Sequence, residues 1–136
     1  MLVSDLITDL TAAFEQFPNA ADWRVGVACY TNGPGSDINV MYVASFHADG
    51  YEDFTLVPEG LGESFGLEEK PFTAEELLAA LQANPSWASF AAYATAEAVQ
   101  LPDGRIVSKN GPLWGTGVQE SAQLLYFYYG TSGAEA

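Results

Sequence analysis

The spacing of hydrophobic residues near the start of the chain predicts an amphipathic helix over residues 4–17. Leu6, Leu10 and Phe14 recur every four residues, so their side chains fall on one face of a helix. Ser4 is a suitable N-cap, and a Pro-Asn pair follows the pattern and ends it. We expect this face to pack on the sheet that the next three segments form.

The next three hydrophobic segments alternate with the two-residue period of β-strands. They cover residues 23–31, 38–47 and 51–57, and short turns rich in Gly, Asn and Asp join them. Short turns between consecutive strands favour an antiparallel meander. The period divides the second strand into two faces, one with Ile38, Val40, Tyr42, Ala44 and Phe46 and the other with Asn39, Met41, Val43, Ser45 and His47.

A second helical region follows an acidic loop over residues 58–70. Thr73 and Glu76 have the spacing of a capping box, so a helix is expected to begin there and to stop near Asn84. Proline is tolerated at the first position of a helix, and a further helix is therefore predicted over residues 85–93.

The last third of the chain predicts a hairpin and one final element. Residues 95–101 and 105–108 flank a Pro-Asp-Gly turn, and residues 110–112 are expected to form a loop. Residues 117–129 fit either a helix or a strand, with a slight preference for a strand because the segment is aromatic. The order of elements predicts one α+β domain over residues 1–130, with helices packed on one sheet face, and a flexible tail over residues 131–136.

The charged residues are few but strongly unbalanced. The chain has 18 Asp and Glu residues against four Lys and Arg residues, and its formal net charge is −14 at pH 7. A field of this sign repels nucleic acids and anionic membranes and speeds the encounter with basic partners. Acidity also increases solubility, and it is common in salt-adapted proteins, so the sequence leaves these explanations open.

Features at the N-terminus and the cysteine content favour a cytoplasmic location. Cys29 is the only cysteine, so no internal disulfide is expected. The first residues lack the positive segment of a signal peptide. No apolar run approaches the roughly 20 residues that a membrane-spanning helix needs.

Residues that could support chemistry are isolated from one another. Ser45, His47 and Asp49 lie two residues apart on a predicted strand, where successive side chains on one face are about 7 Å apart. A nucleophile and its base need about 2.6–3.2 Å, so we interpret His47 as a solvated residue at a strand end. Cys29 alternates with Val25 and is expected to point into the core.

The sequence predicts no metal or cofactor site. One His and one Cys do not make a closed zinc site, and the acids at residues 49–53 lack calcium-loop spacing. The glycine-rich segments lack the pattern G-x-G-x-x-G and the lysine of a phosphate-binding loop. In the aromatic run at residues 126–129, the two outward residues either form an interface or are buried under the helices, and both interpretations stay open.

The order of elements resembles that of the small acidic immunity proteins of bacterial toxin systems, especially the YezG-like group. The similar features are the opening helix over residues 4–17, Trp23 at the start of a strand, a long second strand through Tyr42 and Phe46, and the aromatic ending at residues 124–130. The family has no catalytic residues to carry over. The resemblance implies stoichiometric binding to a basic toxin.

We therefore expect a binding inhibitor rather than an enzyme, with a basic toxin domain or a nucleic-acid enzyme as its partner. A phage-encoded inhibitor fits the same physics, because closely spaced carboxylates imitate phosphates. Two alternatives stay open: a ligand-binding or enzymatic domain with a pocket holding a carboxylate of shifted pKa, and a structural subunit of a phage particle. The expected partner contacts are Tyr51 as aromatic anchor with Glu52, Asp53, Glu59, Glu63, Glu68 and Glu69.

Overall fold

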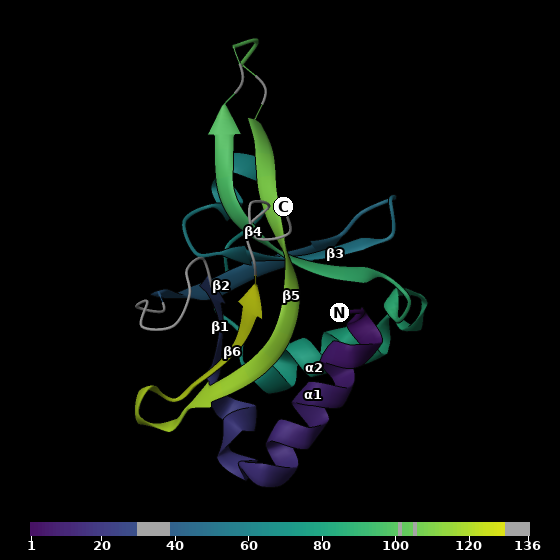
Figure 1. Cartoon of the computed structure of the whole chain (residues 1–136), viewed down its shortest axis with the longest axis vertical. Coiled ribbons are helices and arrows are strands. Elements are labelled where there is room, and N and C mark those ends of the chain that lie inside the picture. Colours follow the sequence, from purple (N-terminus) through teal and green to yellow (C-terminus); the bar gives the residue numbers. More distant parts are fainter. Residues whose placement is uncertain (30–38, 101, 105, 130–136) are drawn as a thin grey trace.

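Six β-strands close into a barrel in the computed structural model of the chain (Figure 1). The structure describes residues 1–29, 39–100, 102–104 and 106–129, and the statements below concern these residues. The strands are β1 (Arg24–Cys29), β2 (Asn39–Ala48), β3 (Asp53–Pro58), β4 (Ala91–Gln100), β5 (Ile106–Gln119) and β6 (Leu124–Tyr129).

The barrel combines local hairpins with two parallel pairings between segments distant in sequence. β1, β2 and β3 form the antiparallel meander that the sequence predicts, and β4, β5 and β6 form a second one. β3 pairs with β4 in parallel, and β6 pairs with β1 in parallel. These two contacts join the meanders on both sides, so the predicted sheet is closed rather than open.

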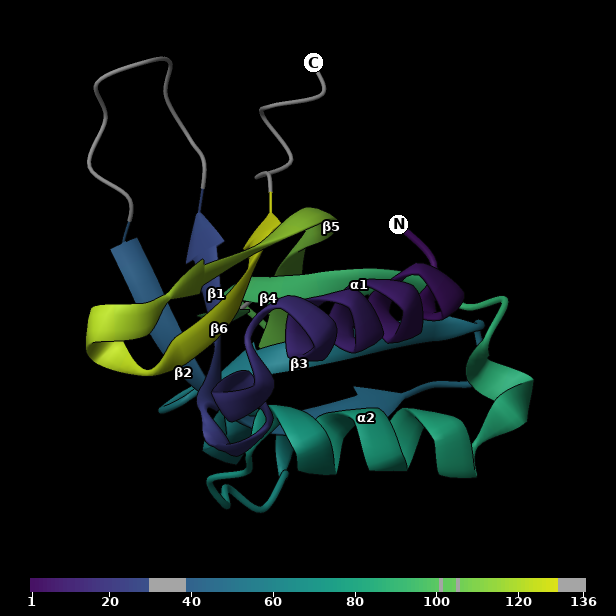
Figure 2. The same cartoon turned by 90° about the horizontal axis from the view of Figure 1, so that it is seen from below.

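Two α-helices complete the α+β fold. They are α1 (Val3–Gln16) and α2 (Ala74–Ala83), and they pack against each other beside β3 (Figure 2). The predicted N-cap Ser4 is wrong, because α1 begins before it and Asp5 accepts a hydrogen bond from the Leu2 N–H at 2.7 Å. No helix within the described residues has the length and hydrophobicity to cross a membrane.

One hydrophobic core joins the helices to the inside of the barrel. Leu6 and Leu10 of α1 are fully buried, as their spacing predicts, and so are Leu77 and Leu81 of α2. They pack with buried residues of all six strands, which are Val25, Val27, Val43, Phe54, Leu56, Ala92, Ala94, Leu113, Leu125, Phe127 and Tyr129. The helices therefore fill the concave side of the curved sheet.

Two predictions in the second half of the chain differ from the structure. The helix expected over residues 85–93 is a single turn, Pro85–Trp87, after which the chain enters β4 at Ala91. The loop expected at residues 110–112 lies inside β5, where Pro112 pairs with Tyr93 between two register shifts. The final element is a strand, as favoured, with buried Phe127 and Tyr129 facing the core. The predicted tail at residues 131–136 lies outside the described residues.

The strict alternation expected along β2 is broken by a register shift between Val43 and Ser45. Val43, Ala44 and Ser45 are all buried, whereas Tyr42 is exposed. An extra residue in one strand of an antiparallel pair produces this pattern, because it turns the following side chains to the opposite face.

Candidate functional site

The barrel contains a seam where β1 and β2 separate. The two strands pair from Asn39 to Tyr42, and beyond that point residues 70–74 lie between them. The Lys70 N–H donates to the Ala44 carbonyl at 2.9 Å, and the Ala74 N–H donates to the Trp23 carbonyl at 2.8 Å. The chain leading into α2 thus joins the two strands at the seam.

Arg24 holds the β1 side of this seam. Its guanidinium lies 4.4 Å from the centre of the Tyr42 ring and forms an ion pair with Glu59 at 3.0 Å. The Arg24 Nη2 atom that pairs with Glu59 also donates a hydrogen bond to the Val43 carbonyl at 3.4 Å. Arg24 is therefore committed to contacts within the protein and neutralises one acid of the loop that follows β3.

The acidic loop after β3 is fixed against β2. It contains the 3-10 turn Gly62–Phe65, and the Glu69 carboxylate accepts a hydrogen bond from the Gly60 N–H. Gly62 packs so tightly that a Cβ placed there would come within 2.6 Å of the Ser45 Oγ. A side chain at position 62 would push the loop away from β2, so glycine is needed at this close approach.

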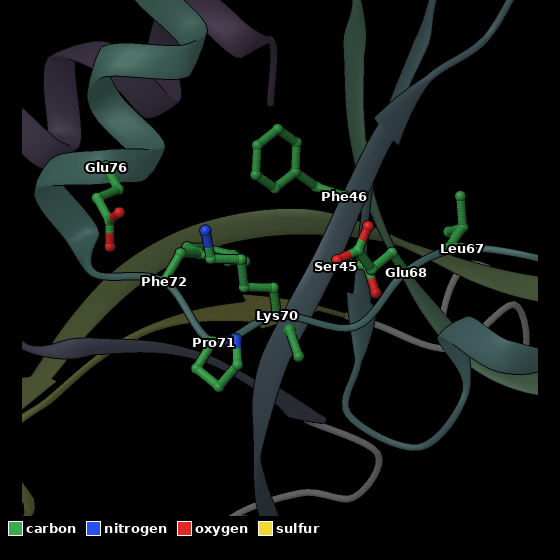
Figure 3. Close-up of a pocket in the computed structure, with 9 residues that line it drawn as sticks. Ser45, Phe46, Leu67, Glu68, Lys70, Pro71, Phe72 and Glu76 are labelled. Carbon is green, nitrogen blue, oxygen red and sulfur yellow. The ribbon is translucent and has the colours of Figure 1, made fainter.

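A groove of about 480 Å3 lies between β2, residues 67–72 and the first turn of α2 (Figure 3). Phe46 projects from β2 toward α2, and its ring meets that of Phe72 edge to face at 5.3 Å. Ser45 is 6% exposed, and its hydroxyl has no hydrogen-bond partner among the described residues. The lining comprises Ala44, Ser45, Phe46, Leu67, Glu68, Lys70, Pro71, Phe72 and Glu76.

Two glutamates, Glu68 and Glu76, line this groove together with Lys70. Residues 59–76 contain six Glu and one base, Lys70. Among the side chains that the structure describes, the ion pair between Arg24 and Glu59 is the only one. Glu76 accepts a hydrogen bond from the Thr73 N–H at 2.9 Å, and the Glu76 N–H donates to the Thr73 hydroxyl at 3.2 Å, which confirms the predicted capping box.

The structure divides the predicted partner contacts between the two ends of β3. Tyr51, Glu52 and Asp53 lie at the turn between β2 and β3, where Tyr51 is 87% exposed. Glu59, Glu63, Glu68 and Glu69 lie in the loop beyond the other end. Since β3 runs from Asp53 to Pro58, the two groups are about 17 Å apart at about 3.3 Å per residue. They therefore lie at opposite ends of β3.

The turn between β2 and β3 uses its acids for local structure. Asp49 Oδ1 accepts hydrogen bonds from the Tyr51 N–H at 2.8 Å and the Asp53 N–H at 3.2 Å. Burial raises the pKa of the Asp53 carboxyl, and the nearby Asp49 charge raises it further. Within the described residues, no three His, Cys, Asp or Glu side chains are grouped so that they could hold a metal ion.

The polar residues of β2 face different surroundings. Ser45 lines the groove, whereas His47 lines a separate cavity of about 250 Å3 with Phe65, Leu67 and Thr95. Asp49 is engaged by the turn described above. The arrangement therefore does not assemble these three side chains into one site. The side chain of Cys29 lies outside the described part of the chain.

A second surface with aromatic side chains lies on the outside of β6. Tyr126 and Tyr128 are half-buried, and their hydroxyls lie 3.2 Å apart. The Tyr126 ring covers Gly117 of β5, where a Cβ would come within 2.7 Å of it. The hydrogen bond between the Tyr126 and Tyr128 hydroxyls, together with partial burial, raises the pKa of Tyr126 to about 12. The run is therefore divided between the core, which buries Phe127 and Tyr129, and the outer face, where Tyr126 and Tyr128 are partly exposed.

The sequence did not identify the groove, because its walls come from three separate segments. The one local signal was Lys70, the first base after a run of acids, and its side chain lies in the groove. Comparison of the chain with protein-family models, with curated proteins and with solved structures found no match.

Proposed function

We propose that this protein is a stoichiometric binding inhibitor that docks a basic protein partner on the surface formed by residues 59–76. The observation that carries this proposal is the groove of about 480 Å3 with apolar walls and glutamates at its rim. Interfaces of this kind combine a desolvated apolar centre with a charged rim that steers the partner. A basic toxin domain and a nucleic-acid enzyme are the two partner classes that suit this charge.

The distribution of ion pairs supports a role for the acids beyond folding. Glu63, Glu68 and Glu75 are exposed, and no described base pairs with them. Acids that stabilise a fold usually pair with bases or hydrogen-bond to backbone groups, as Glu59, Glu69 and Glu76 do here. The remaining acids of this surface are available to a partner, although their charge also increases solubility.

An enzymatic or ligand-binding role would be favoured by a carboxylate of shifted pKa inside the groove. Among the residues that the structure describes, the carboxylate whose pKa is raised is that of Asp53, which lies at the turn between β2 and β3 and does not line the groove. The groove and the perturbed carboxylate thus occur at different places, and we favour the binding role for that reason.

The test compares two double variants that remove the same charge from different surfaces. Glu63→Gln with Glu68→Gln removes two acids from the proposed surface, and Glu15→Gln with Glu120→Gln removes two exposed acids elsewhere. The partner is recovered by crosslinking, identified and purified, and its association is followed by stopped-flow fluorescence. We expect the first variant to associate about three- to tenfold more slowly at low salt, and the second to associate nearly as fast as the wild type.

Salt provides the internal control for this experiment. Raising the ionic strength to physiological values should slow the wild type more than the Glu63→Gln, Glu68→Gln variant, because screening acts over about 8–10 Å. The proposal fails if the recovered partner is acidic. It also fails if both double variants associate at the wild-type rate in low salt, in which case the acidity serves solubility alone.

A further inference from the structure

The groove contains a stretch of β2 whose backbone is open to pairing. β1 pairs with β2 no further than Tyr42, and the described residues supply one backbone hydrogen bond to the same edge beyond it, from Lys70 to the Ala44 carbonyl. Alternate residues of a strand direct their backbone groups to the same edge. The next residue facing this edge is Phe46, and Figure 2 shows this end of β2 running between β3 and α2.

The side chains beside this edge suit an extended segment. Phe46, Leu67 and Phe72 form an apolar wall that can cover a medium-sized apolar side chain. Glu68 and Glu76 line the same groove and can receive a basic side chain. In an added strand, successive side chains point to opposite faces, so apolar and basic residues would have to alternate.

The negative charges around this edge of β2 favour a positively charged occupant. Six glutamates lie within residues 59–76 against Lys70, and Glu59 is already paired with Arg24. Lys70 also lines the groove, and no described acid forms an ion pair with it. Lys70 therefore opposes a basic occupant, and removing its charge should strengthen binding rather than weaken it.

We infer that the groove binds an extended basic segment of the partner protein, which pairs as an added strand with the edge of β2 at Phe46. This inference rests on the proposed function and makes it more specific. The occupant has alternating basic and apolar residues, its apolar side chains pack on Phe46 and Phe72, and its basic side chains face Glu68 and Glu76.

The probe is the hexapeptide Lys-Val-Lys-Val-Lys-Val with blocked ends, titrated into the full chain and followed by amide chemical shifts. Two N-methylated versions are compared, one methylated at the three Lys residues and the other at the three Val residues. An added strand directs one alternate set of its N–H groups toward β2, so methylation of that set removes the hydrogen bonds. We expect one methylated peptide to bind about tenfold more weakly than the parent and the other to bind within about twofold.

Protein variants test the charges without disturbing the core. Glu68→Gln should weaken binding of the parent peptide about two- to fivefold at low salt, and Lys70→Gln should strengthen it by a similar factor. Glu15→Gln is the matched control and should bind like the wild type. The amides of residues 44–48 should shift in the wild type, in Glu68→Gln and in Lys70→Gln.

The outcomes separate this inference from the proposed function. If the parent peptide binds in a salt-dependent way but both methylated peptides bind equally well, or the amides of residues 44–48 do not move, the strand pairing is wrong and the acidic docking surface stands. If the Glu-Val hexapeptide of the same length binds as well as the Lys-Val peptide, the acidic docking surface is also wrong. Absence of binding by the Lys-Val peptide at low salt overturns the inference about the groove.

Discussion

Replacing Arg24 by Met should destabilise the protein by about 1–2 kcal/mol. The ion pair with Glu59 contributes about 0.2–1 kcal/mol, because the two side chains are 32% and 54% exposed and solvent screens them. The contact with the Tyr42 ring at 4.4 Å contributes about 0.5–1 kcal/mol. The hydrogen bond to the Val43 carbonyl is long, at 3.4 Å, and contributes about 0.5 kcal/mol.

Two features reduce the sum of these contributions. The buried Nε of Arg24 has no hydrogen-bond partner among the described residues, so removing it recovers part of a desolvation cost. Met also keeps most of the apolar stem that Arg buries. The expected loss therefore stays near the lower half of the summed range.

Urea unfolding of Arg24→Met, Tyr42→Leu and the double variant measures the coupling between these side chains. A coupling free energy of about 0.5–1 kcal/mol is expected, and a parallel cycle with Glu59→Gln should give a smaller value. Arg24→Lys keeps the charge without the planar guanidinium and should fall between wild type and Arg24→Met. A total loss under about 0.5 kcal/mol, or additive effects of Arg24→Met and Tyr42→Leu, would refute the role of Arg24 at the seam.

Three further substitutions test the core and the two shifted pKa values. Leu10→Ala should cost about 2–5 kcal/mol in urea unfolding, because Leu10 is fully buried, and a loss below about 1 kcal/mol would contradict that burial. The raised pKa of Asp53 means that the folded state favours the protonated carboxyl. The stabilisation that the protonated carboxyl contributes is present below the usual pKa and is lost as pH rises through the raised pKa. Asp53→Asn should therefore unfold at higher urea than wild type at pH 7, with the difference disappearing near pH 3. The raised pKa of Tyr126, about 12, against an ordinary value of 10.0 predicts a loss of stability as pH rises through that window. Tyr126→Phe should show a smaller decrease in urea midpoint over this range, and equal decreases would contradict the shift.

Local signals predicted the elements whose structure depends on neighbours in sequence. The spacing of Leu6 and Leu10 and the capping box at Thr73 and Glu76 were correct, because both depend on contacts within a few residues. The turn before β5 was also correct, and Gly104 there has φ of 89°, which glycine adopts readily. Helix and hairpin positions were therefore accessible from the sequence.

Closure of the barrel was not accessible in the same way. The parallel contacts of β3 with β4 and of β6 with β1 join segments separated by long stretches of chain, and no local pattern encodes them. The Asn-Gly-Pro sequence at residues 110–112 normally indicates a loop, yet its proline lies within a strand, between a register shift in the pairing of β5 with β4 and another in its pairing with β6. Similarly, the irregularity between Val43 and Ser45 changed the faces of β2 in a way that alternation does not predict.

The candidate site was predicted in part. The sequence identified the acids between residues 49 and 69, and the strand predicted over residues 51–57 already separated Asp53 from Glu59. The groove itself depends on Phe46, Leu67 and Phe72, which come together only in the folded barrel. The acidic character of this region was thus predictable from the sequence, whereas the groove beside the acids was not.

The seam and the groove have a common origin in the irregularity of β2. It directs the carbonyls of both Val43 and Ala44 away from β3, one to Arg24 and the other to the Lys70 N–H. The connection from β3 to α2 passes along β2, where the Lys70 N–H donates to the Ala44 carbonyl, and the same connection carries the acids. Because Ser45 is buried under Gly62 and Phe46 packs on Phe54, substitutions at the base of the groove would disturb the barrel as well. Substitutions at the rim, in Glu68 and Lys70, are consequently the ones that separate binding from folding.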